Sequence, residues 1–145
     1  MGLFRPSASK VAAEVDKTAA RMTGAFVASM SRNYPELASG LQKTAVASIL
    51  IDVAADILLR GIALTRGPVF AQKASFEFAR REGTRFEELV ELCLEATRSG
   101  RTQESAVARL VSYEAGTGNP SDWEKFVTEF KQNMTQAVFR ASQAS

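Results

Sequence analysis

The chain has 145 residues, of which 46% are hydrophobic and 23% are charged, and its formal net charge is +2. These values are typical of one globular domain and exclude a disordered, collagen-like or disulfide-stapled chain. The sequence has one cysteine and no histidine, so the usual zinc, haem and histidine-assisted nucleophilic chemistries lack a ligand or a base. We therefore expect no metal and no cofactor.

Residues 9–32 have the apolar spacing of an amphipathic helix. Val11, Val15, Met22 and Phe26 lie four or seven residues apart and form one stripe that would face a core. The preceding segment, 1–8, is expected to be loose. Pro35 predicts the next boundary, because the residue before a proline avoids the α region and proline itself suits the first turn of a helix.

The second predicted helix begins near Pro35, is expected to pause at Ser39 and Gly40, and has its main body over about 41–65. This body contains TAVASILIDVAADILLRGIAL, the most apolar stretch of the chain. A helix that is apolar on most sides belongs at the centre of a fold. Its length is close to that of a membrane span, but Asp52, Asp56 and Arg60 lie inside it. Each charge would cost about 2.5–3.5 kcal/mol at a bilayer centre, so we predict no membrane span.

Four further helices are expected over 68–82, 84–99, 102–115 and 121–140, with glycines or prolines at the breaks between them. Thr84 with Glu87 and Ser121 with Glu124 match the capping-box pattern, and Thr102 is a predicted N-cap. Six helices with short connections predict an all-α fold, a compact bundle in which residues 1–145 form a single domain.

With Ser48, the charged residues Asp52, Asp56 and Arg60 form a polar line along the apolar helix, since they are spaced four apart. Three hypotheses follow. The line is a solvated edge on which Asp56 pairs with Arg60, the two carboxylates act together on one substrate or cation, or the line is buried in a two-fold dimer. No other group converges on the carboxylates, and Cys93 is expected to be a small core residue. We predict no catalytic residue and no enzyme.

Arginines near predicted helix ends are a second set of candidates, because helix N-termini and guanidinium groups bind phosphate and other anions. They are Arg80, Arg81, Arg85, Arg98 and Arg101. Neighbouring glutamates and the small net charge favour a solvated basic rim, so nucleic acid is not an expected partner. A regulator that binds phosphate or nucleic acid is kept as an alternative.

Some large apolar residues fall outside the predicted core stripes, among them Phe76, Phe139 and the pair Leu3 and Phe4. Apolar residues that converge on a surface form contact patches. We therefore expect a cytoplasmic protein that contacts another protein as an adaptor, regulator or neutralising partner, and that forms a homodimer. The interface candidates are Asp52, Asp56, Arg60, Phe76 and Phe139. The second alternative is a helical pocket for a small apolar ligand near Asp52 and Asp56.

Overall fold

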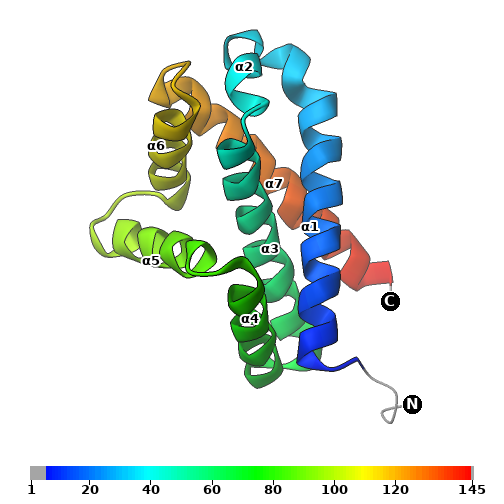
Figure 1. Cartoon of the computed structure of the whole chain (residues 1–145). Coiled ribbons are helices and arrows are strands. Elements are labelled where there is room, and N and C mark those ends of the chain that lie inside the picture. The colour runs from blue at the N-terminus through cyan, green and yellow to red at the C-terminus, as the bar shows by residue number, and fades with distance from the viewer. Residues whose placement is uncertain (1–5, 145) are drawn as a thin grey trace.

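The computed structural model describes residues 6–144, which form seven α-helices, two short 3₁₀ turns and no strand (Figure 1). The helices are α1 (Ala8–Met30), α2 (Ala38–Leu41), α3 (Thr44–Arg66), α4 (Pro68–Glu82), α5 (Arg85–Arg98), α6 (Gln103–Ala115) and α7 (Pro120–Ala144). The predicted all-α, single-domain bundle is confirmed.

The predicted second helix is interrupted at residues 42–43, close to the pause expected at Ser39 and Gly40, and this raises the number of helices from six to seven. The one-turn helix α2 ends at Leu41, and Lys43 is extended before α3 begins. Gly40, next to the break, lies in a tightly packed place, because a Cβ there would lie 2.8 Å from both the Ala115 side chain and the Trp123 ring. The chain packs Gly40 tightly against α6 and α7 and then changes direction, so one straight helix does not run through this region.

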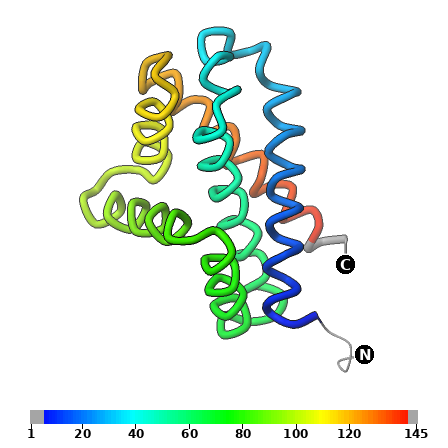
Figure 2. Tube along the Cα trace, viewed as in Figure 1, coloured from blue at the N-terminus to red at the C-terminus, as the bar shows by residue number. Residues whose placement is uncertain are grey.

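The predicted central helix is α3, which lies in the middle of the bundle and contacts all six other α-helices (Figure 2). Leu50, Val53, Ala54 and Ala55 are all buried. By contrast, α5 projects sideways from the bundle and lies across the direction of α3 (Figure 1). Besides the surfaces that pack against α1 and α4, α3 has one side that faces α7 and another that faces α5 and α6.

The regular apolar stripe of α7 forms an aromatic core with α1. Trp123, Phe126 and Phe130 are fully buried, and the ring of Phe26 lies edge-on to Phe126 and Phe130 at centroid distances of 5.5 and 5.2 Å. Edge-to-face packing of this kind adds to the free energy gained from burial alone. It fixes α7 against α1 along the first half of α7.

One of the three predicted caps is confirmed and two are wrong. The Thr102 hydroxyl accepts a hydrogen bond from the Ser105 amide, as an N-cap does. Thr84 has helical rather than extended backbone angles, so its side chain does not reach the amide it would cap. Pro120 occupies the first position of α7, which moves the cap back to Asn119, whose side chain accepts a hydrogen bond from the Asp122 amide.

The apolar residues outside the predicted stripes are exposed where the structure describes them. Phe76 is 60% exposed and Phe139 is 61% exposed, whereas Leu3 and Phe4 lie outside the described residues. Leu94 on α5 is also exposed, at 41%. In the described part of the chain, no helix has both the length and the apolarity needed to cross a membrane.

Candidate functional site

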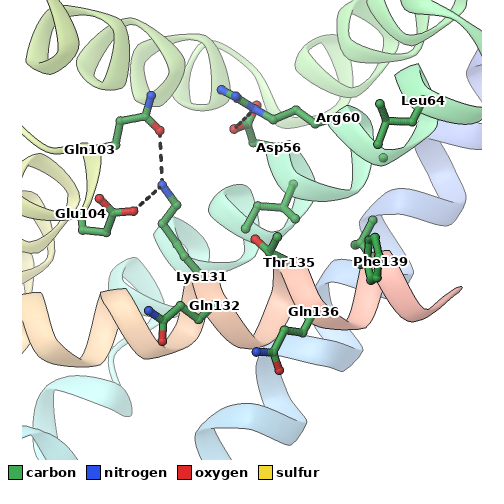
Figure 3. Close-up of a pocket in the computed structure, with 13 residues that line it drawn as sticks. Asp56, Arg60, Leu64, Gln103, Glu104, Lys131, Gln132, Thr135, Gln136 and Phe139 are labelled. Atoms are coloured by element: carbon green, nitrogen blue, oxygen red, sulfur yellow. Dashed lines mark hydrogen bonds and ion pairs between the residues drawn. The ribbon is translucent and has the colours of Figure 1, made fainter. Parts of the chain in front are cut away.

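A groove lies between α3 and α7 and is closed at one end by the start of α6 (Figure 3). It encloses about 750 Å³. Its lining is largely apolar, with contributions from Ile57, Gly61, Leu64, Val138 and Phe139. A volume of this size is in the range of protein sites that receive a ligand or an inserted side-chain cluster.

Gly61 sets the distance between the two helices that form the groove. A Cβ built on Gly61 would lie only 2.5 Å from Cγ1 of Val138, so a side chain there would collide with α7. Glycine inside a helix costs about 0.5–1 kcal/mol relative to alanine. The close approach of α3 and α7 explains why this cost is tolerated.

The edges of the groove are polar, and their charges are balanced. On α3, Nε of Arg60 lies 3.0 Å from a carboxylate oxygen of Asp56. At the opposite end, Nζ of Lys131 lies 3.1 Å from Glu104 and donates a 3.3 Å hydrogen bond to Gln103 (Figure 3). Burial alone would raise the pKa of Glu104, but its own backbone amide and Lys131 hold it below the ordinary value.

Leu64 on α3 and Phe139 on α7 both lie at the end of the groove remote from Lys131 (Figure 3). Leu64 is 85% exposed and Phe139 is 61% exposed, so two large apolar side chains face solvent at this end of the groove. The structure thus brings three of the predicted interface residues, Asp56, Arg60 and Phe139, to one surface. Phe76, on α4, is exposed but does not line this groove.

Asp52 does not belong to the same surface, although it is one helical turn from Asp56. Asp52 is completely buried. Arg85 of α5 donates two hydrogen bonds to its carboxylate, from Nε at 2.7 Å and from a second guanidinium nitrogen at 3.3 Å. Arg85 also donates to Glu82. Burial raises the pKa of Asp52, and the Arg85 guanidinium opposes this shift. The predicted polar line is therefore interrupted at Asp52: Ser48 and Asp56 are half-buried, and Arg60 is exposed.

The two aspartates also face different hollows. Asp56 lines the α3–α7 groove, whereas Asp52 lines a second pocket of about 610 Å³ between α3, α5 and α6. Cooperation of both carboxylates on a single substrate would need them to meet in one cavity. Because they lie in different hollows, each carboxylate is better described by its own ion pair, Asp56 with Arg60 and Asp52 with Arg85.

The arginine candidates do not gather into one basic site. Arg80 pairs with Glu77 at 3.2 Å, Arg81 with Asp16 at 3.7 Å, and Arg98 with Glu95 at 3.6 Å. Arg85 is engaged by Asp52 and Glu82 as described above. Arg101 is exposed just before α6. Four of the five guanidinium groups thus already have a carboxylate beside them.

Cys93 is half-buried, and burial raises the pKa of its thiol, so the reactive thiolate form is disfavoured. It lines a cavity of only about 20 Å³ under α5. Over residues 6–144, no three cysteine, aspartate or glutamate side chains are arranged to hold a metal ion.

Sequence reasoning missed Leu64, Val138, Lys131 and Gly61 as parts of the groove. Only Gly61 carried a usable signal, because a glycine within an apolar helix indicates close packing against a neighbour. Leu64 resembled the core residues of the same apolar run, since nothing in the local pattern showed that it would be exposed at the groove.

No protein-family model matches this sequence, and comparisons with curated proteins and with solved structures find no similar protein.

Proposed function

We propose that this protein acts without catalysis, through protein–protein contact, and that the α3–α7 groove receives an amphipathic helix of a partner protein. The observation that carries the proposal is the pair of exposed apolar side chains, Leu64 and Phe139, at the end of a largely apolar groove. The proposed setting is the cytoplasm, as expected for a chain whose single cysteine cannot form an internal disulfide.

The dimensions of the groove favour a helix as its occupant. Along α7 the lining residues run from Lys131 to Phe139, which corresponds to about 12 Å at the helical rise of 1.5 Å per residue. Two turns of a partner helix present apolar anchors at positions i, i+3 or i+4, and i+7 over a similar length. Leu64 and Phe139 would pack between the anchors of the last turn.

The polar edges would select the partner rather than attract it over long distances. Because Asp56 and Glu104 offset Arg60 and Lys131, the groove carries no net charge. Its neutral donors and acceptors are Gln132, Thr135 and Gln136 on α7 and Gln103 at the start of α6. A partner helix with both signs of charge and amide side chains on its flanks fits this pattern, and a strongly charged one does not.

Self-association uses the same surface in this proposal. A second copy could insert its Leu64 and Phe139 into the groove of the first, and the zero net charge would not repel it. Asp52 takes no part, because it is buried and paired with Arg85. Light scattering at tens of micromolar protein measures the mass of the particle in solution and so distinguishes a monomer from a dimer. Arg60→Glu should weaken a dimer whose interface is the α3–α7 groove. A dimer of unchanged affinity in this variant would exclude the groove as its interface.

The proposal is tested with a displayed library of amphipathic helical peptides of two to four turns. Peptides selected on the wild-type protein should bind Leu64→Glu at least about tenfold more weakly, because the new carboxylate must be desolvated beside the apolar floor. Phe76→Glu is the matched control, since Phe76 is similarly exposed but lies outside the groove. Equal binding to Leu64→Glu, or no selection of helical peptides, would refute the proposal.

A further inference from the structure

The second pocket, between α3, α5 and α6, is a separate site with a different charge from the α3–α7 groove. It encloses about 610 Å³, which is enough for a small organic molecule. Four large aliphatic side chains line it: Ile49, Leu89, Leu92 and Leu110. Ile49 and Leu89 are buried, and Leu92 and Leu110 pack against the same core, so the apolar lining is continuous with the hydrophobic core.

The polar lining of this pocket is acidic. It includes the carboxylates of Asp52, Glu88 and Glu114 and only one cation, Arg85. The charge of Arg85 is already offset, because the guanidinium donates to both Asp52 and Glu82. Glu88 on α5 and Glu114 on α6 therefore leave an excess of negative charge around an aliphatic floor.

We propose that this pocket binds a small cationic amphiphile, an organic amine whose aliphatic or aromatic body rests on the four aliphatic residues and whose ammonium group faces Glu88 and Glu114. An anionic ligand is disfavoured by the three carboxylates. A purely apolar ligand would leave the acidic edge without a counter-charge. The site is independent of the α3–α7 groove, so this proposal and the proposed function can fail separately.

The buried ion pair gives the pocket a fixed wall. Asp52 is held on α3 and Arg85 on α5, and the two hydrogen bonds between them set the position of α5 beside the pocket. A preformed pocket loses less conformational freedom on binding than one that must be assembled by the ligand. Arg85 is thus a positioning residue here and does not bind the amine.

Three probes with the same hydrocarbon chain separate the contributions of charge and apolar contact: octylamine, octanol and octanoate. Calorimetric titration should give the tightest binding for octylamine, then octanol, then octanoate. In methyl NMR spectra, octylamine should shift the signals of Leu89, Leu92 and Leu110. Equal affinity for all three probes, or shifts at Leu64 and Val138 instead, would overturn the proposal.

The double variant Glu88→Gln/Glu114→Gln should weaken octylamine binding about tenfold and leave octanol binding unchanged. Glu91→Gln is the matched control, because Glu91 is an exposed carboxylate on α5 that does not line the pocket. Leu110→Trp, which fills the pocket without adding charge, should abolish binding of both probes while circular dichroism confirms the fold. Octylamine binding that survives both the double variant and Leu110→Trp would refute the site.

Discussion

Arg85 and Asp52 are 33 residues apart in the sequence, yet Arg85 donates two hydrogen bonds to the Asp52 carboxylate, the shorter at 2.7 Å. The carboxylate is fully buried, whereas 43% of the arginine side chain is exposed. The pair connects the central helix α3 to α5, the helix that projects from the bundle. The pair therefore links α5 to α3 and also compensates the buried charge of Asp52.

We predict that Arg85→Met lowers the free energy of unfolding by about 2–3 kcal/mol, because it leaves Asp52 buried without a partner. Arg80→Met, which removes an exposed pair with Glu77, should change it by less than about 1 kcal/mol. Urea denaturation measures both values. The double variant Asp52→Leu/Arg85→Met should recover most of the loss, since no unpaired charge remains. An equal loss in the single and double variants would contradict this account.

The loss in Arg85→Met should depend on pH. Burial raises the pKa of Asp52, and removing Arg85 removes the group that opposes this rise. A folded-state pKa above the unfolded value of about 3.9 favours the folded protein at acid pH and costs stability as pH rises through the folded value. The difference between variant and wild type should thus shrink as pH falls from 7 towards 4. A difference that is independent of pH would show that Asp52 does not titrate in the variant.

Tyr34 should make the stability of the folded protein depend on pH in a second, alkaline range. Burial, with a smaller effect of Glu129, raises its pKa to about 12, and its ring lies edge-on to Phe126. The folded protein keeps the phenol proton that an unfolded chain loses near pH 10, so stability should fall as pH rises from about 10 to 12. Tyr34→Phe should flatten this part of the pH profile, and Tyr113→Phe, at an exposed site, should not. Urea midpoints across this range test the prediction.

Substitution of two different glycines by alanine should change the stability of the fold in opposite directions. Gly61→Ala places a methyl group 2.5 Å from Val138, so we expect a loss of about 1–3 kcal/mol from overpacking. Gly24→Ala adds the same methyl group where nothing lies within 4 Å, so it should gain up to about 1 kcal/mol from helix propensity. Adding Val138→Ala to Gly61→Ala should restore part of the loss. Thermal denaturation of the wild type, the two single variants and the double variant measures these effects. Higher stability of Gly61→Ala than of the wild type would show that α3 and α7 are not in close contact.

Thr23 is buried on α1, and among the described side chains its hydroxyl is the buried polar group without a hydrogen-bond partner. Thr23→Val keeps the shape and removes the unsatisfied hydroxyl, so it should stabilise the protein by about 1 kcal/mol. The same change at Thr18, which is only half-buried on the same helix, should have a smaller effect. Destabilisation by Thr23→Val would indicate that the hydroxyl has a partner in solution.

The sequence predicted features that depend on local pattern. The apolar run around Leu50 identified the central helix, and Pro35 and Pro68 marked real boundaries. Pairing of Asp56 with Arg60 followed from their spacing of four residues. These properties depend on neighbours within one or two helical turns, which the sequence displays directly.

Properties that depend on contacts between helices could not be predicted from the sequence. Nothing near Asp52 indicates that Arg85 will reach it, because the partner comes from another helix with a different direction. Leu64 belongs to the same apolar run as Leu50, yet Leu64 is 85% exposed and Leu50 is buried, because the packing of the other helices around α3 decides which of them is covered. The site therefore required the fold, although several of its residues had been singled out individually.

Trp123 has a practical consequence for all of these measurements. It is the only tryptophan of the chain, it is fully buried, and its indole N–H donates a 2.8 Å hydrogen bond to the Thr117 carbonyl. Its fluorescence emission should therefore shift to longer wavelength when water reaches the ring. Because one indole lies where α2, α6 and α7 meet, its emission serves as an intrinsic optical probe of whether this end of the bundle is still closed.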